Sequence, residues 1–252
     1  MRTAAILPVK RFPIAKQRLG ESVADSLRAD LARAMVGDVL SALRECSAIE
    51  ATIVVTCESS VAAAARYIGA IVVEDAAEEG QSAAVSLGLA RALREGFERA
   101  LCIPGDCPTL DPGELDRLLQ RGGQGVESVQ EGVHAHTRTR ARGTPSREDP
   151  PREVVIVPDR HGTGTNGLLL TPPDVMTPSF GPNSCERHGE LAKAAGARCR
   201  IERVASLLLD VDTGEDLAVL RERLAGERIH APRTRAVLGL GKRRWQSSRP
   251  AA

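Results

Sequence analysis

Three aspartates occupy positions where a protein can hold a divalent metal ion. Asp106 follows the apolar run Leu101–Ile103 in a Pro-Gly-Asp-Cys-Pro turn, and Asp210 and Asp212 alternate at the end of another apolar run. In extended backbone, residues two apart point to the same side, so Asp210 and Asp212 are expected to share a face. Paired carboxylates repel each other unless a cation neutralises them, and their oxygens suit a hard metal. The alternatives are an ordinary turn at Asp106, and a cap at Asp212 or Thr213 beside a solvated Asp210.

A cluster of cations follows the first apolar run of the chain. Lys10, Arg11, Lys16 and Arg18 lie within one short segment directly after Ala4–Val9. Ammonium and guanidinium groups gathered at the end of a strand suit a triphosphate. The segment lacks the GxxxxGK[ST] pattern of a Walker A loop. A solvated basic loop is an equal alternative when the segment is taken alone.

Two further segments combine glycine with hydroxyl side chains. They are Asp159–Asn166, which reads DRHGTGTN, and Phe180–Ser184, which reads FGPNS. Glycine lets backbone N–H groups and neighbouring hydroxyls approach an anion closely. Ser184 is expected to open and cap a helix, which adds the positive end of the helix dipole. Either half alone is compatible with a plain turn, whereas the two together predict a site for a phosphate or a carboxylate.

The combination of these groups predicts phosphoryl or nucleotidyl transfer. A basic loop can bind a triphosphate, acidic side chains can hold the metal, and an anion site can bind the acceptor. In such reactions the metal bridges the triphosphate and stabilises charge, while an acceptor oxygen attacks in line.

The elements that must position these groups alternate between strands and helices, which predicts an α/β fold with a mostly parallel sheet flanked by helices. Ligands of such sheets bind beyond the carboxyl ends of strands, here after residues 9, 103, 157 and 210. Strands are expected at Ala4–Val9, Ala51–Thr56, Ala70–Val73, Ala100–Ile103, Val154–Val157, Gly167–Leu170 and within Ile201–Asp210. Helices are expected at Ala24–Leu43, Val61–Tyr67, Ser82–Phe97, after Asp111 with Glu114 closing a capping box, and at Glu186–Ala195. A last helix is expected to be capped by Thr213 and to run through Leu224, with Asp216 at the third helical position.

Composition excludes several classes of protein. The 252 residues carry a net charge of +1 and only 2% aromatic side chains, which argues against nucleic-acid binding. No apolar window approaches the length of a membrane span, and the expected location is the cytoplasm. The expected organisation is one nucleotidyltransferase domain over residues 1–227, a flexible insertion at about 121–152, and a basic tail at 228–252 that is either disordered or docked on the domain.

The motifs of this chain resemble those of the guanylyltransferases of coenzyme F-420 biosynthesis, which activate phosphoenolpyruvate or 2-phospho-L-lactate with GTP. The matching segments occur in the order of that family and cover most of residues 4–222. They are PVKRFPIAKQRL, PGDCPTL, PDRHGTGTN, FGPNSCERH and LDVDTGEDL. The resemblance implies a single Rossmann-like sandwich of the GT-A type that uses Mg²⁺, and a homodimer is compatible with it.

The resemblance also implies a role for each site residue. Asp106, Asp210 and Asp212 are expected to carry the metal, and Thr165, Gly181 and Ser184 to hold the acceptor. Lys10, Lys16 and Arg18 are expected to face the phosphates of GTP, with Asp106 and Lys16 acting directly in catalysis. The attacking atom is an acceptor phosphate oxygen that is already anionic, so no general base is assigned. The products are a GMP-activated diphosphate and pyrophosphate.

Two other functions compete with this one. A nucleotidyltransferase of the same fold could act on a molybdopterin or a sugar phosphate, and the segment EEGQSAAVSLGLARA resembles the base-proximal segment of the molybdenum-cofactor enzymes, which leaves CTP open beside GTP. A non-catalytic nucleotide-binding protein could also keep the fold, but it would be expected to lose one of the three aspartates.

Overall fold

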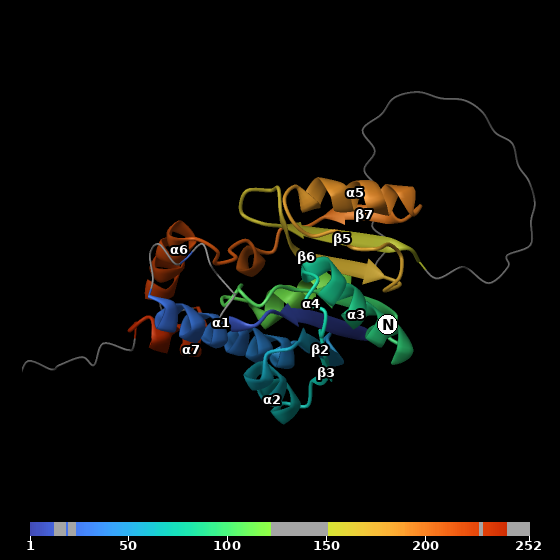
Figure 1. Cartoon of the computed structure of the whole chain (residues 1–252). Helices are drawn as coiled ribbons and strands as arrows, with labels where there is room; N and C mark the ends of the chain where they lie inside the picture. Colours follow the sequence, from blue (N-terminus) through green and yellow to red (C-terminus); the bar gives the residue numbers. More distant parts are fainter. Residues whose placement is uncertain (13–18, 20–23, 122–150, 227–228, 241–252) are drawn as a thin grey trace, which may run out of the picture.

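The fold is a seven-stranded sheet with helices on both faces, as seen in a computed structural model that describes residues 1–12, 19, 24–121, 151–226 and 229–240 (Figure 1). The strands are β1 (Thr3–Val9), β2 (Ala51–Thr56), β3 (Ile71–Val73), β4 (Arg99–Cys102), β5 (Glu153–Pro158), β6 (Thr165–Thr171) and β7 (Arg198–Ile201). The helices are α1 (Asp25–Glu45), α2 (Ser59–Tyr67), α3 (Gln81–Arg94), α4 (Pro112–Arg121), α5 (Ser184–Ala194), α6 (Gly214–Ala225) and α7 (Pro232–Val237), with a 3-10 turn at Ala205–Leu207.

The strands lie in the order β3-β2-β1-β4-β6-β5-β7. Within the described part of the chain, β6 alone runs against the others, because it pairs antiparallel with both β4 and β5 while the remaining pairs are parallel. The first residues of β6 therefore lie at the edge where its neighbours end. This reversal adds a strand start to the edge at which parallel sheets bind their ligands.

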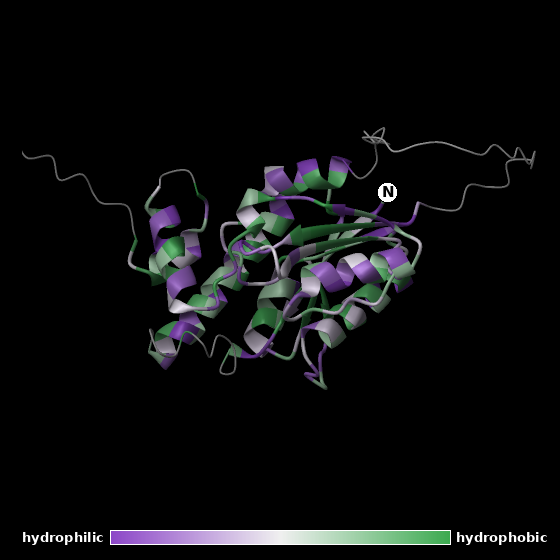
Figure 2. Ribbon diagram, turned by 90° about the horizontal axis from the view of Figure 1, so that it is seen from above, coloured by the Kyte–Doolittle hydropathy of each residue, from purple (hydrophilic) through white to green (hydrophobic). Residues whose placement is uncertain are grey.

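Alternating side chains of the central strands feed two separate cores. One face packs against α1, α2 and α4 through residues such as Leu7, Val54 and Leu101. The other face packs against α3 and α5 through residues such as Ile6 and Ile156. The central strands are green in Figure 2, as expected of a sheet buried on both faces, while the helices also carry purple segments.

A third cluster joins the last described residues of the chain to α1. Leu209 and Val211 are fully buried there with residues of α1, α6 and the segment before α7. The buried carboxylate of Asp38 on α1 accepts the N–H groups of Arg233 at 3.1 Å and Thr234 at 2.8 Å, which fixes the start of α7. Of the two alternatives for the basic tail, residues 229–240 therefore take the docked one. Residues 241–252, like the insertion at 122–150, lie outside the described residues.

The expected helices and strands are found within a few residues, but three local expectations are wrong. No strand covers 202–210: β7 ends at Ile201, and side chains take the backbone groups that a strand would use, since Glu114 accepts the N–H of Ser206 at 2.8 Å. Glu114 consequently does not close the capping box, although Asp111 does cap α4 at the Glu114 N–H, 2.9 Å away. The third concerns Ser184 and is described with the site.

Helix α3 packs closely against the sheet at Gly88. A Cβ atom there would overlap the Cγ2 atom of Ile6 and lie 3.1 Å from that of Val55, and both neighbours are fully buried. We expect Gly88→Ala to lower the free energy of unfolding by about 1–3 kcal/mol, because overpacking exceeds the gain in helix propensity. Urea denaturation measures the change.

The matched control is Gly189→Ala in α5, where a Cβ atom meets nothing within 4 Å. It should leave stability unchanged or raise it by up to about 1 kcal/mol. Equal stabilities for the two variants would contradict the close packing of α3 on β1.

Candidate functional site

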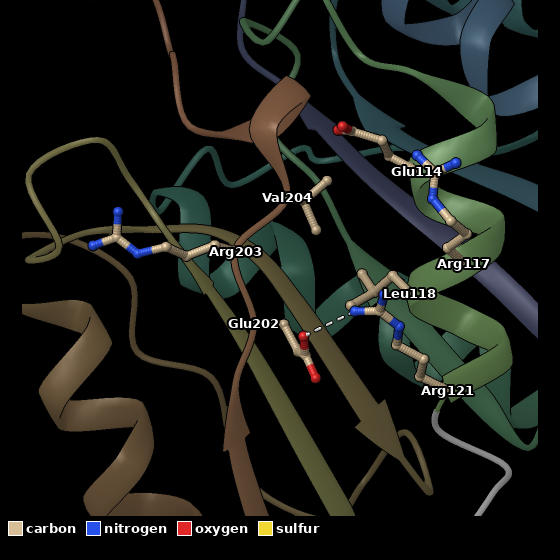
Figure 3. Close-up of a pocket in the computed structure, with 7 residues that line it drawn as sticks. All are labelled: Glu114, Arg117, Leu118, Arg121, Glu202, Arg203 and Val204. Atoms are coloured by element: carbon tan, nitrogen blue, oxygen red, sulfur yellow. Dashed lines mark ion pairs between the residues drawn. The ribbon is translucent and has the colours of Figure 1, made fainter.

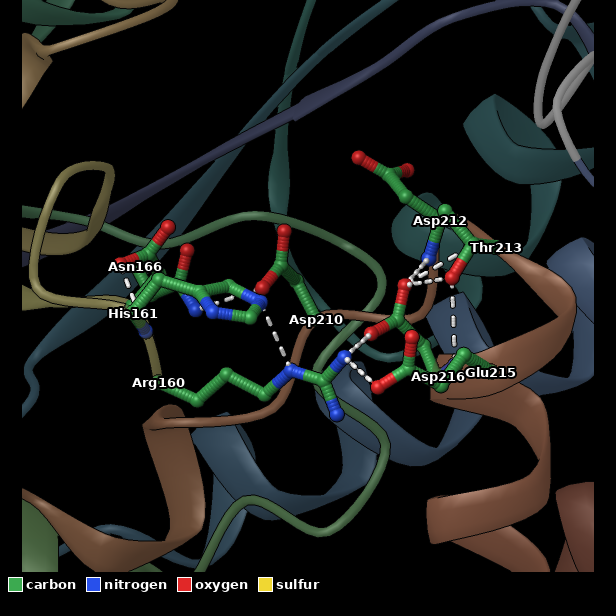
Figure 4. Close-up of polar contacts among 9 residues, drawn as sticks. Arg160, His161, Asn166, Asp210, Asp212, Thr213, Glu215 and Asp216 are labelled. Atoms are coloured by element: carbon green, nitrogen blue, oxygen red, sulfur yellow. Dashed lines mark hydrogen bonds and ion pairs between the residues drawn. The ribbon is translucent and has the colours of Figure 1, made fainter.

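The three aspartates lie together at the carboxyl edge of the sheet. The C=O of Asp106, after β4, accepts the N–H of Val211 at 3.1 Å, which brings the Asp210–Asp212 segment beside it. Leu209 and Val211 are buried while Asp210 and Asp212 are partly exposed, so the two carboxylates alternate with core residues as expected. Figure 4 shows both carboxylates extending to the same side of the segment.

Asn166 is a site residue to which the sequence motif gave no role. Its amide nitrogen donates to Asp210 Oδ1 at 3.0 Å and to the C=O of Leu207 at 2.8 Å. Both donated hydrogens of the amide are thereby used, and the Asp210 carboxylate is held in one orientation. The available signal was its place beside Thr165 in a strand, since adjacent strand residues point to opposite faces.

The aspartates act on each other electrostatically. Burial raises the pKa of Asp210, and the negative charges of Asp106 and Asp212 raise it further, while the hydrogen bond from Asn166 opposes these effects. A nearby cation would offset both the cost of burying the ionised carboxylate and the repulsion between the aspartates. Among the described residues, however, no three His, Cys, Asp or Glu side chains are already gathered closely enough to hold a metal ion.

A capping box fixes the backbone next to Asp212. The hydroxyl of Thr213 accepts the N–H of Asp216 at 3.2 Å, and the Asp216 carboxylate accepts the N–H groups of Thr213 and Asp212 at 2.8 and 3.1 Å. Arg160 forms ion pairs with Asp216 at 2.9 Å and Glu215 at 3.2 Å (Figure 4). The cap of α6 is therefore Thr213, as expected, whereas Asp210 is bonded to Asn166 and is not simply solvated.

Thr165, Ser184 and His188 form a second cluster, which we call the hydroxyl cluster. The Ser184 hydroxyl donates to Thr165 Oγ1 at 3.1 Å, and His188 Nδ1 lies 3.1 Å from the same oxygen. All three side chains are buried, with exposed fractions of 7%, 2% and 0%. Gly181 lies nearby in the chain as an exposed residue with φ of 121°, a conformation that favours glycine.

Two parts of the predicted anion site are arranged differently from expectation. The N–H groups of His161 and Thr163 donate to Asp159 Oδ1 at 3.1 and 3.0 Å, so the loop uses these two donors internally. Ser184 is the first residue of α5 but does not cap it: Asn183, in the left-handed conformation, is the N-cap, and no side chain caps there. The Ser184 hydroxyl is instead engaged with Thr165.

The described part of the basic loop starts at the same edge. Lys10 is exposed directly after β1, while Arg11 pairs with Glu78 at 3.3 Å and the N–H of Phe12 donates to Glu58 at 3.3 Å. Lys16 and Arg18 lie outside the described residues. At this edge Asn166 contacts Asp210 on one face of β6, and the adjacent residue Thr165 belongs to the hydroxyl cluster on the other face.

A small pocket of about 100 Å³ lies elsewhere, between α4 and the residues after β7 (Figure 3). Its lining includes Arg117, Arg121 and Glu202, and an ion pair of 3.6 Å joins the last two. None of the predicted site residues lines it, so it is separate from the edge described above.

No helix in the described part of the chain is long and apolar enough to cross a membrane.

Known proteins resemble this chain in fold and in sequence. The MobA-like NTP transferase domain family matches residues 18–140. A putative nucleotide-diphospho-sugar transferase from Desulfovibrio desulfuricans superposes with a TM-score of 0.65 at 17% identity, over 95% of each chain. This likeness confirms the expected nucleotidyltransferase sandwich of the GT-A-like type.

Relatives of higher identity are guanylyltransferases. The chain is 45% identical to a phosphoenolpyruvate guanylyltransferase of Conexibacter woesei, over 94% of this chain and 96% of that one. It is 31% identical to a 3-phospho-D-glycerate guanylyltransferase of Phenylobacterium zucineum, over 96% and 98% of the two chains. It is also 31% identical to a 2-phospho-L-lactate guanylyltransferase of Methanothermobacter thermautotrophicus, over 92% and 88%.

The buried imidazole of His188 should make stability depend on pH. Burial, with the charge of Arg187, lowers its pKa from 6.5 to about 4. Between these values the unfolded chain binds the proton and the folded one does not, so stability falls as pH falls from 6.5 to 4, by on the order of 3 kcal/mol. Urea unfolding at pH 7, 6 and 5 should show this loss in the native protein and much less of it in His188→Gln. The exposed His161→Gln serves as control, and equal slopes for native protein and His188→Gln would contradict the assignment.

Asp210→Asn should stabilise the protein. Because the pKa of Asp210 is raised in the folded state, ionisation costs stability as pH rises from 3.8 through the folded pKa. The amide variant can still accept from Asn166 and carries no charge. We expect a higher melting temperature at pH 7 in EDTA. We expect no gain at pH 3, where the Asp210 carboxyl group is protonated in both the folded and the unfolded chain. The exposed Asp174→Asn is the matched control, and a lower melting temperature for Asp210→Asn at pH 7 would sink this account.

Proposed function

The chain belongs to the guanylyltransferase family that includes the phosphoenolpyruvate and 2-phospho-L-lactate enzymes, and on that premise we propose that its own acceptor is phosphoenolpyruvate. The observation that carries the choice is the 45% identity to a phosphoenolpyruvate guanylyltransferase along nearly the whole chain. The reaction transfers GMP from GTP to the acceptor phosphate and releases pyrophosphate. Its place is the biosynthesis of coenzyme F-420, in the cytoplasm.

The acceptor is the open choice within the family. Phosphoenolpyruvate, 2-phospho-L-lactate and 3-phospho-D-glycerate each join a phosphate to a small carboxylic acid, so one anion site can select among them by shape. Differences of one or two substituents are worth about 1–3 kcal/mol in a fitted pocket. 2-Phospho-L-lactate is the second candidate, because a relative that matches 92% of this chain is named a 2-phospho-L-lactate guanylyltransferase.

Thr165, Gly181 and Ser184 are proposed to bind this acceptor. The hydroxyls of Thr165 and Ser184 are hydrogen-bonded to each other, and the Ser184 N–H donates to the C=O of the exposed Gly181, whose missing side chain leaves the backbone open to an anion. A bound phosphate or carboxylate would then lie at the edge of β6, near the aspartates on its other face. Lys10, Lys16 and Arg18 are proposed to bind the phosphates of GTP, with Lys16 acting in catalysis.

Asp106, Asp210 and Asp212 are proposed to hold Mg²⁺. The fit is supported by the hard oxygen donors and by the raised pKa of Asp210, which results from burial and from the negative charges of Asp106 and Asp212. Among the described residues no three such groups are gathered at binding distance, so water and the oxygens of the triphosphate would supply the remaining ligands. The ion would neutralise triphosphate charge during transfer. The attacking acceptor oxygen is already anionic, so these residues orient and stabilise rather than remove a proton.

Pyrophosphate release by the purified protein tests the proposal. With Mg²⁺ and GTP, we expect release that depends on phosphoenolpyruvate and is weaker with 2-phospho-L-lactate or 3-phospho-D-glycerate. EDTA should abolish it. CTP in place of GTP tests the choice of base.

Asp106→Asn is the matched variant, because it keeps the shape of the side chain and the backbone bond to Val211. We expect it to lower kcat by at least about 100-fold with the fold intact. Release that prefers another acid would move the acceptor assignment to that acid. No release with any of the three acids, under either nucleotide, would overturn the proposed function.

A further inference from the structure

His188 is a buried histidine that the proposed reaction does not use directly. Its side chain is 0% exposed, and both ring nitrogens have partners. Nε2 accepts the backbone N–H of Ser179 at 2.9 Å, and Nδ1 lies 3.1 Å from Thr165 Oγ1. It thus connects the strand that carries Thr165 with the segment before Gly181.

These two contacts determine which nitrogen carries the proton. A backbone N–H can only donate, so Nε2 must present its lone pair to Ser179. The neutral ring then carries its hydrogen on Nδ1, which donates to Thr165 Oγ1. Burial keeps the ring neutral by lowering its pKa to about 4.

The direction of the Thr165 hydroxyl follows from this tautomer. Its oxygen accepts from His188 Nδ1–H and also from the Ser184 hydroxyl, 3.1 Å away. A hydroxyl oxygen has two acceptor sites, and both are now occupied. The hydrogen of Thr165 therefore remains to donate to a further acceptor, such as an anionic oxygen.

His188 also supports the segment on the other side of the acceptor residues. The Phe180 ring packs edge-on against the imidazole, with ring centroids 5.0 Å apart and planes at 75°. The Phe180 N–H donates to Ser82 Oγ on α3 at 2.9 Å. The backbone just before Gly181 is thus fixed by a ring contact and by bonds from Ser179 and Phe180.

We infer that His188 is a positioning residue for the acceptor, which sets the Thr165 hydroxyl as a donor to an anionic oxygen of a phosphorylated carboxylic acid. This inference rests on the proposed function. His188 acts through Thr165 and the Ser179–Gly181 segment and does not touch the reacting atoms.

Two substitutions separate its two contacts. In His188→Asn the amide nitrogen can occupy the place of Nδ1 and donate to Thr165, whereas in His188→Gln the amide oxygen can occupy the place of Nε2 and accept from Ser179. We expect His188→Gln to raise the KM for the acceptor about tenfold, with the KM for GTP unchanged. His188→Asn should recover most of the acceptor KM.

A double-mutant cycle links the effect to the hydroxyl. Thr165→Val alone should raise the acceptor KM, and adding His188→Gln should raise it no further, because the donor lost to the second change has no oxygen to meet. The fully buried Leu43→Ala, at the far end of α1, controls for destabilisation and should leave the acceptor KM unchanged at temperatures where the protein stays folded.

The outcomes distinguish this inference from the proposed function. If the native protein releases no pyrophosphate with any acceptor, the proposed function fails, and the inference falls with it. If the native protein is active but His188→Asn and His188→Gln raise the acceptor KM equally, or raise the KM for GTP as well, the positioning role is overturned. Additive effects in the cycle with Thr165→Val would also overturn it.

Discussion

The reversed direction of β6 is the constraint on which the candidate site depends. Because this strand runs against its neighbours, it begins at the edge where β4 and β5 end. Its first two residues then face opposite sides: Thr165 meets Ser184 and His188, while Asn166 meets Asp210. Asp210 and the hydroxyl cluster are consequently held by two adjacent residues of one strand.

The parts of this arrangement that the sequence predicted depend on local rules. Alternating residues indicated that Asp210 and Asp212 share a face, and the spacing of Thr213 and Asp216 indicated a helix start. The parts that it missed depend on partners distant in the chain. Asn166 meets Asp210 only because the fold brings them together. The 3-10 turn at Ala205–Leu207 likewise depends on elements that are distant in sequence but near in space. Ser184 follows a helix-start pattern, but Thr165, on another element, takes its hydroxyl.

The site is costly to keep in the free protein. Burial and neighbouring charge disfavour ionised Asp210, and burial disfavours protonated His188. Such groups are stable only where surrounding contacts hold them, here the Asn166 amide and the backbone N–H of Ser179. Arg160 similarly forms ion pairs with Asp216 and Glu215, so its charge stabilises the start of α6. One edge of the sheet thus holds groups whose charged forms are unfavourable, and hydrogen bonds from fixed neighbouring groups partly offset that cost.

The pairing of β4 with β6 has a consequence for how the protein is made. Ribosomes deliver the chain from its N-terminus, so β1 to β4 emerge while the partner for the open side of β4 is still to be synthesised. An unpaired apolar strand such as β4 is a site for mispairing with other chains until β6 covers it. Asp106 acquires its partner later still, because the N–H that donates to its C=O belongs to Val211. A nascent chain therefore acquires a nearly complete sheet before it acquires a complete site.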